Sequence, residues 1–320
     1  MLTSVEICAG AGGQALGLEM AGFEHLAAVE IDSDACNTLR ANRPNWNVIE
    51  SDLNEWDPTP YKGVDLFAGG VPCPPFSVAG KQLGADDERD LFPRALEIIE
   101  VLEPKAVMLE NVKGLLSKRF ADYRNEIIKA MGKLGYVVDW QLINSSDYGV
   151  PQLRPRSILV ATHKDLDGCF VWPERRPDEA STVGDTLHDL MASNGWEGAD
   201  AWAEGAQKIA PTLVGGSKKH GGPDLGPTRA KAAWAEMGVN GKSIAEVAPE
   251  PGYAEMPRLT VRMAARIQGF PDDWQITGRK TAAYRQVGNA FPPPVSCAIG
   301  TEIANLLNQN VEVKDGRVAA

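Results

Sequence analysis

One cysteine of this chain stands in a setting that favours nucleophilic chemistry. Cys73 lies between Pro72 and Pro74, shortly after the apolar run 64–68. A buried, inert thiol is the usual role of a cysteine, and we keep that interpretation for the other four cysteines of the chain. Prolines stiffen turns more often than they line a core, and a thiol exposed at a pocket is a chemical hazard unless it is used. The motif therefore predicts a nucleophile at the carboxyl end of a strand, where open α/β sheets bind their ligands.

A carboxylate and two arginines are predicted to approach the same edge of the sheet. Glu110 follows the apolar run 106–109, and Arg154 and Arg156 alternate in an extended segment, which sends both guanidiniums to one face. Beside a thiol and a ligand, burial can raise the pKa of such a carboxyl group and make it an acid. The structural alternatives are a solvated strand end for Glu110 and a surface ion-pair cluster for the arginines.

A glycine-rich turn and two acidic residues predict a cofactor that contains adenosine. The turn runs from Cys8 to Gly13 and opens a helix, so its backbone can approach a ligand closely. Glu30 ends the second strand, where it can accept both hydroxyls of a ribose, and Asp52 ends the third, where it can receive an adenine amino group. A dinucleotide and S-adenosylmethionine both fit this pattern, and a tight turn without a ligand is the structural alternative.

The elements that position these residues predict an α/β fold with a doubly wound, mostly parallel sheet. We expect strands at 4–8, 25–29, 48–51, 64–68, 106–109, 137–143 and 157–161, and helices at 14–21, 33–41, 91–102 and 122–134. From about residue 172 proline and glycine rise and the alternation stops, which predicts a second, smaller and irregular domain at 172–282. Thr260 is expected to cap a helix that runs to Ile267, and a helix at 294–307 is expected to pack back on the first domain, which comprises 1–171 and 283–320.

Composition sets the broad class. The 320 residues are 43% hydrophobic and 23% charged, as in a globular protein, and the net charge of -11 argues against indiscriminate coating of nucleic acid. The region 205–243 is an exception, with six cations against two acids. No long apolar stretch and no secretory signal are visible, so we expect a cytoplasmic protein without a membrane segment. The five cysteines form no Cys-x-x-Cys pair, which predicts neither a disulfide framework nor a metal site.

Taken in order, these motifs resemble the DNA cytosine-5 methyltransferase family over nearly the whole chain. The cofactor turn is similar to the family's Phe-x-Gly-x-Gly, and Glu30 and Asp52 stand at the positions of its ribose and adenine acids. The remaining matches are Pro72-Cys73, Glu110-Asn111-Val112, Gln152-x-Arg154-x-Arg156, Arg258-Leu259-Thr260 with Gln268-Gly269-Phe270-Pro271, and Tyr284-Arg285-Gln286-Val287-Gly288-Asn289-Ala290. The chain departs from the family at Cys8, where phenylalanine is usual, and at Pro74, where glutamine is common.

The resemblance implies a class I, Rossmann-like methyltransferase fold and a site-specific enzyme that methylates C5 of a cytosine flipped out of duplex DNA. It implies that Cys73 adds to C6, Glu110 protonates N3, Arg156 holds O2, and Arg154 helps to fix Glu110 and the base. The implied cofactor is S-adenosylmethionine, with S-adenosylhomocysteine as product and no metal. The implied cofactor-binding residues are Cys8, Ala9, Gly10, Gly12, Gly13, Glu30, Ile31, Asp52, Leu53, Pro72, Asn289 and Phe291.

Double-stranded DNA is the implied partner of a monomeric enzyme, and the region 172–282 is the implied target-recognition domain. The expected DNA-binding residues are Ser77, Gly80, Lys81, Gln82, Arg89, Thr212, Lys218, Lys219, His220 and Arg229. The enzyme is either solitary or paired with a restriction endonuclease that acts on the same site without a stable complex. The alternatives are an RNA (tRNA) cytosine-5 methyltransferase, a nicotinamide-dependent oxidoreductase, and an inactive DNA-binding homologue.

Overall fold

The computed structural model describes residues 1–72, 90–215 and 223–314, with side chains to residue 310. Its centre is a seven-stranded sheet in the order β3-β2-β1-β4-β5-β8-β6. The strands are β1 (Leu2–Ile7), β2 (Phe23–Glu30), β3 (Val48–Glu50), β4 (Leu66–Gly70), β5 (Ala106–Val112), β6 (Tyr136–Asn144) and β8 (Pro155–His163). The first five positions of that order are parallel, and β8 runs antiparallel to both β5 and β6. The predicted mostly parallel, doubly wound α/β sheet is confirmed.

Helices cover both faces of the sheet. They are α1 (Gly13–Met20), α2 (Ser33–Asn42), α3 (Phe92–Leu102), α4 (Ala121–Lys133) and α10 (Pro293–Lys314). Alternate residues of one strand serve opposite faces: Phe67 packs in the cluster that contains α3 and α4, while Leu66 packs in the cluster that contains α1 and α10. Among the residues that the structure describes, no helix has both the length and the apolar character needed to cross a membrane.

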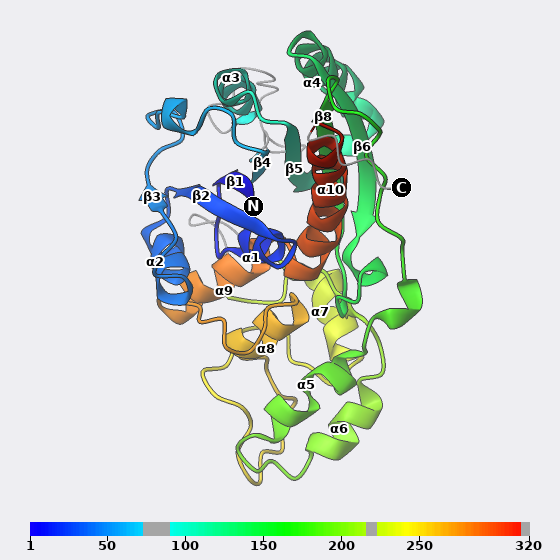
Figure 1. Cartoon of the computed structure of the whole chain (residues 1–320). Helices are drawn as coiled ribbons and strands as arrows, with labels where there is room; N and C mark the ends of the chain where they lie inside the picture. Colours follow the sequence, from blue (N-terminus) through cyan, green and yellow to red (C-terminus); the bar gives the residue numbers. More distant parts are fainter. Residues whose placement is uncertain (73–89, 216–222, 315–320) are drawn as a thin grey trace.

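The region after residue 171 is more helical than we predicted. It contains η5 (Pro177–Glu179), α5 (Val183–Ala192), α6 (Ala199–Gly205), α7 (Thr228–Ala235) and α8 (Val261–Ile267), followed by α9 (Lys280–Asn289). Figure 1 shows α5 to α8 gathered at one end of the molecule, away from α3 and α4. Glycine and proline lie mainly between these helices, for example at Gly198 and Pro227, which directly precede α6 and α7. Thr260 caps α8 as expected, because its side chain accepts a hydrogen bond from Met263 N.

This region shares its core with the first part of the chain. Trp202, Trp234 and Leu259 belong to one buried cluster, and that cluster also contains Ala11 and Leu16 from the start of the chain. A two-stranded ladder adds a second connection, since β7 (Gln152–Leu153) pairs in parallel with β9 (Ala210–Pro211). Short 3-10 turns complete the description: η1 (Thr59–Tyr61), η2 (Lys113–Leu116), η3 (Lys118–Phe120) and η4 (Ser145–Asp147). The domain boundaries at 171 and 282 stay a prediction.

Candidate active site

The pairing of β5 with β8 brings Glu110 and Arg156 together. Val112 and Arg156 are directly opposite in the antiparallel ladder, and Glu110 lies two residues before Val112 on the same face. Such diagonal neighbours are within reach of long side chains. Arg156 Nε lies 2.7 Å from Glu110 Oε1, and each side chain is only 13% exposed. Burial lowers the pKa of Arg156 and the Glu110 carboxylate opposes that shift.

The carboxyl end of β4 lies beside this pair. Gly70 is opposite Glu110 in the β4–β5 ladder, and a Cβ built on Gly70 would lie 3.3 Å from Glu110 Oε2, so the glycine leaves space next to the acid. Asn111 fixes the end of β4, because its Nδ2 donates to Val71 O at 2.7 Å. Pro72 follows and is exposed. Cys73, the next residue in the chain, lies outside the described residues.

The Glu30 carboxylate at the end of β2 is hydrogen-bonded to the turn after β1. Glu30 accepts hydrogen bonds from Gly10 N at 2.8 Å, Ile31 N at 2.9 Å and Asp32 N at 2.8 Å. A carboxylate offers about four acceptor positions, so about one remains for a ligand. The expectation that Glu30 accepts both hydroxyls of a ribose stays a prediction.

A cavity of about 460 Å³ joins the turn after β1 to Glu110. That volume lies in the range of pockets for small organic ligands. Of the predicted cofactor residues, those that line it are Cys8, Ala9, Gly10, Glu30, Ile31, Asn289 and Phe291. Gly10 has left-handed backbone with φ of 54°, and the nearest atom to a Cβ built there is 4.0 Å away, so its missing side chain leaves open space. The candidate acid and the candidate cofactor turn therefore share one cavity.

Glu6 is a lining residue that the sequence analysis missed. It lies on β1, is 1% exposed, and its Oε2 has no hydrogen-bond partner among the described residues. Burial and the nearby Glu30 carboxylate raise the pKa of Glu6 well above its usual range, and a main-chain hydrogen bond from Ala15 opposes this shift. A buried carboxyl oxygen without a partner at a cavity is a group that a polar ligand can satisfy. Its only signal in the sequence is an acid inside an apolar strand.

The comparison with known protein families decides between the cofactor classes left open above. Residues 2–305 match the family model described as C-5 cytosine-specific DNA methylase. The chain belongs to this family. The family match does not favour the RNA methyltransferase or the nicotinamide-dependent oxidoreductase, and it implies S-adenosylmethionine as the cofactor of this DNA methylase.

Curated relatives agree with the family. The DNA methylase is 56% identical to Type II methyltransferase M.NaeI of Lentzea aerocolonigenes, over 99% of this chain and 78% of the relative. It is 52% identical to Type II methyltransferase M.NgoMIV of Neisseria gonorrhoeae, over 96% of this chain and 98% of the relative. Among solved structures, a putative DNA modification methyltransferase encoded within an Escherichia coli prophage aligns with a TM-score of 0.68 at 23% identity, covering 96% of this chain and 100% of that chain. This likeness shows the fold.

The methylase turn uses Gly12 and Gly13 for packing, whereas Gly10 faces the cavity. A Cβ on Gly12, where φ is 80°, would lie 2.6 Å from Leu39 Cδ2, and a Cβ on Gly13 would lie 2.1 Å from Phe291 O. Neither glycine is among the residues that line the cavity. The predicted cofactor residues Asp52, Leu53 and Pro72 are not among them either. Their roles in the methylase stay predictions.

Arg154 makes main-chain contacts that the sequence analysis did not predict. It is 0% exposed and its guanidinium donates to Leu213 O at 2.8 Å, Gly288 O at 2.9 Å and Ala290 O at 3.0 Å. Its expected role in fixing Glu110 and the base stays a prediction. Arg154 lies between two strands, because β7 ends at Leu153 and β8 begins at Pro155. The carbonyl groups that it contacts come from segments remote in the sequence.

The second half of α9 contributes further residues that sequence reasoning missed. Gln286 and Arg285 line the cavity, and Arg285 Nη2 lies 3.6 Å from Asp32 Oδ2. Asp32 caps α2 through its side chain. The sequence signal for Arg285 and Gln286 was their place in the tenth family motif, and the signal for Asp32 was its position two residues after Glu30. The methylase thus closes the cavity with a helix that is remote in sequence from the cofactor turn.

Two of the predicted DNA-binding residues can be located. Thr212 Oγ1 donates to Leu153 O at 2.6 Å, which fixes the predicted recognition segment to β7, and Arg229 is exposed on α7. Two cations of the basic region are paired within the chain, Lys208 with Glu236 and Lys231 with Asp224. The other predicted DNA-binding residues lie outside the described residues: Ser77, Gly80, Lys81, Gln82, Arg89, Lys218, Lys219 and His220.

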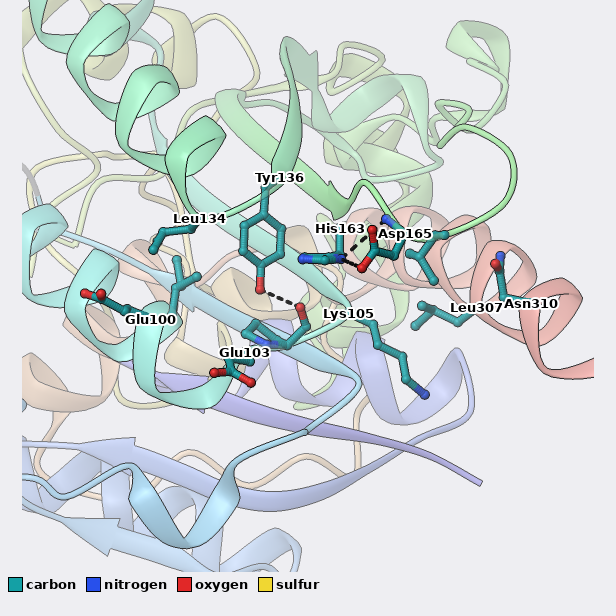
Figure 2. Close-up of a pocket in the computed structure, with 12 residues that line it drawn as sticks. Glu100, Glu103, Lys105, Leu134, Tyr136, His163, Asp165, Leu307 and Asn310 are labelled. Atoms are coloured by element: carbon teal, nitrogen blue, oxygen red, sulfur yellow. Dashed lines mark hydrogen bonds and ion pairs between the residues drawn. The ribbon is translucent and has the colours of Figure 1, made fainter. Parts of the chain in front are cut away.

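A second cavity, of about 480 Å³, lies at the opposite edge of the sheet, near the start of β5 and the end of β8. Figure 2 shows Tyr136 directed at the main-chain oxygen of Pro104, to which its hydroxyl donates at 2.6 Å, and His163 beside Asp165. No predicted site residue lines it. Among the described parts of the chain, no group of three or more His, Cys, Asp or Glu could hold a metal ion.

Proposed function

We propose that this DNA methylase transfers the methyl group of S-adenosylmethionine to C5 of a cytosine that is rotated out of duplex DNA, through a covalent Cys73 adduct at C6. The observation that carries the proposal is that Glu110, buried and paired with Arg156, lines the same cavity as Gly10 and Glu30. β4 ends next to that pair, and Cys73 is the third residue after the end of β4 in the sequence, which supports the proposal.

The residues of the chain divide the work. The Cys73 thiolate adds to C6 and the ring electrons move toward C5, while Glu110 gives a proton to N3 so that charge does not build up on the ring. C5 then takes the methyl group, its proton passes to solvent, the N3 proton returns to Glu110, and the thiolate leaves with restoration of the aromatic ring. In the free enzyme Arg156 pairs with Glu110. In the complex with DNA, Arg156 turns to the O2 atom of the base.

The cavity suits an adenosyl methyl donor, which supplies an electrophilic methyl group when bound. Gly10 offers close approach of the backbone, and Glu30 retains about one acceptor position for a ribose hydroxyl. Glu6 Oε2, buried and without a hydrogen-bond partner among the described residues, can satisfy a polar group of the donor. Ile31 is 66% exposed on the rim of the cavity, where it can cover an apolar ring face.

Trapping tests the covalent step. The wild type should form a stable complex with a duplex that contains 5-fluorocytosine, because fluorine at C5 blocks the final elimination. Cys73→Ser should abolish both the complex and methyl transfer while it binds S-adenosylhomocysteine like the wild type. Methyl transfer that persists in Cys73→Ser would rule out the mechanism. Calorimetric titration with S-adenosylhomocysteine provides the folding control.

We also propose that the region 172–282 reads a specific DNA site and that the enzyme acts as a cytoplasmic monomer. The relatives named above are type II methyltransferases, which supports a partner restriction endonuclease that acts on the same site. Bisulfite sequencing of a plasmid from cells that express the protein should show complete modification of one short sequence. Modification of cytosines without a common sequence would contradict site specificity. Light scattering with and without DNA measures the oligomeric state.

A further inference from the structure

Three exposed cations follow the strand of the candidate acid. Lys113 begins η2, directly after β5, and Lys118 and Arg119 lie in η3. All three side chains are exposed, and none takes part in an ion pair within the described part of the chain. Over 113–124 the sequence has four cations and one acid, Asp122. This segment is therefore positive on a chain whose net charge is -11.

Three cations that have no ion pair among the described residues lie within the seven residues 113–119 and form a dense positive segment on an acidic chain. Acids outnumber cations by 43 to 32, so partners are available. Many exposed cations elsewhere have found one, as in the ion pairs Lys62–Glu103 and Arg40–Glu50. An uncompensated positive segment that begins three residues after Glu110, which lines the cavity, is suited to an anionic partner from outside the chain.

The backbone that carries these cations is fixed in place. Leu115, in the middle of the segment, is fully buried in the cluster that contains α3 and α4. Arg124 from α4 donates to Leu115 O at 2.6 Å and to Ser117 O at 2.8 Å, which ties η2 to η3. The Arg119 guanidinium stacks 5.6 Å from the centre of the Phe120 ring. A rigid mounting lowers the entropic cost of ordering these side chains against a ligand.

Their position relates them to the target base. Lys113 is three residues beyond Glu110, a chain length of at most about 11 Å. We propose that Lys113, Lys118 and Arg119 form a phosphate-binding surface for the DNA strand that carries the target cytosine. The surface holds the backbone on either side of the extruded base while Glu110 and Arg156 face the base itself. This inference rests on the proposed function for the position of the base.

The test compares two triple variants that remove the same charge. K113Q/K118Q/R119Q removes the proposed surface. K129Q/K133Q/K164Q removes three exposed lysines that also have no ion pair among the described residues and that lie on α4 or beyond β8. Fluorescence anisotropy with a short mixed-sequence duplex measures the affinity for DNA at several salt concentrations, with S-adenosylhomocysteine present. The probe needs no knowledge of the recognition site, because phosphate contacts are independent of sequence.

The plot of log affinity against log salt has a negative slope, and we expect its magnitude to decrease by about 0.9 for each lost contact. In K113Q/K118Q/R119Q the slope should therefore be shallower than in the wild type by about 2 to 3. The control variant should keep the wild-type slope, and both variants should bind S-adenosylhomocysteine like the wild type. Equal slopes for the two variants would overturn the proposal. The outcome is separate from that of the trapping experiment: a wild type that fails to trap 5-fluorocytosine refutes the covalent mechanism, whereas the slopes report only on phosphate contacts.

Discussion

Replacing Arg154 by methionine should destabilise the protein by about 3 to 5 kcal/mol, the usual cost of removing one partner from a buried charged network. The side chain is fully buried and its donors satisfy Leu213 O, Gly288 O and Ala290 O. Hydrogen bonds from a charged donor are worth about 1.5 to 3 kcal/mol each. The substitution also removes the cost of burying a charged guanidinium. This cost is visible in Arg154 itself, because burial holds its pKa well below the usual range. The net loss is therefore smaller than the sum of three bonds.

Urea unfolding followed by fluorescence of the eight tryptophans measures the effect. Arg229→Met is the matched control, because Arg229 is exposed and its replacement should change the free energy of unfolding by at most about 0.5 kcal/mol. A loss below about 1 kcal/mol for Arg154→Met would refute the structural role. If that stable variant also lost methyl transfer, the role first predicted from the sequence, fixing Glu110 and the base, would replace it.

Three further predictions concern the cavity. Glu6→Gln should make the unfolding free energy less dependent on pH. Because the pKa of Glu6 is raised in the folded state, its contribution to stability is complete below the unfolded-state pKa and is lost as pH rises toward the folded-state pKa. The wild type should therefore weaken relative to the variant as pH rises above the usual carboxyl pKa in thermal unfolding scans, and parallel pH profiles would contradict this. Gly13→Ala should lower the free energy of unfolding by about 1 to 3 kcal/mol, because the new Cβ would meet Phe291 O. Gly10→Ala should lower it by about 1 kcal/mol, because φ is positive there, and should mainly weaken the binding of S-adenosylhomocysteine. The opposite ranking in urea unfolding and calorimetry would contradict the assignment of Gly13 to packing. Glu110→Gln keeps the shape of the acid but cannot donate its proton, so single-turnover methyl transfer should slow by about 10²- to 10⁴-fold, and an unchanged rate would exclude the acid role.

The sheet and its flanking helices could be predicted because their signals are local. Apolar runs marked every strand of the main sheet to within a few residues, and Thr260 marked the start of α8. The helices α5 to α7 were not predicted, because the prediction used the number of glycine and proline residues in the region and not their positions. Gly198 and Pro227 lie before helices and do not interrupt them. Composition over a long window cannot show that difference.

Part of the lining of the candidate site could be predicted from the sequence, but not its contacts. The strand ends gave Glu110 and Glu30, because a parallel sheet collects the ends of its strands at one edge. The position of Arg154 depends on which carbonyl groups lie nearby, and these come from residues 213 to 290, far along the chain. The burial of Glu6 likewise results from packing by distant elements. No local pattern contains that information.

The reversed direction of β8 has a consequence for engineering. Because β5 ends at the edge that carries Glu110 and β8 starts there, the spacing of Glu110 and Arg156 is set by ladder hydrogen bonds between adjacent strands. The turn between α4 and β6, at residues 134–135, lies at the far end of this excursion. A peptide tag or a small domain inserted at that turn should leave the edge that carries Glu110 undisturbed, which makes it an attachment point for tethering the enzyme to a chosen locus.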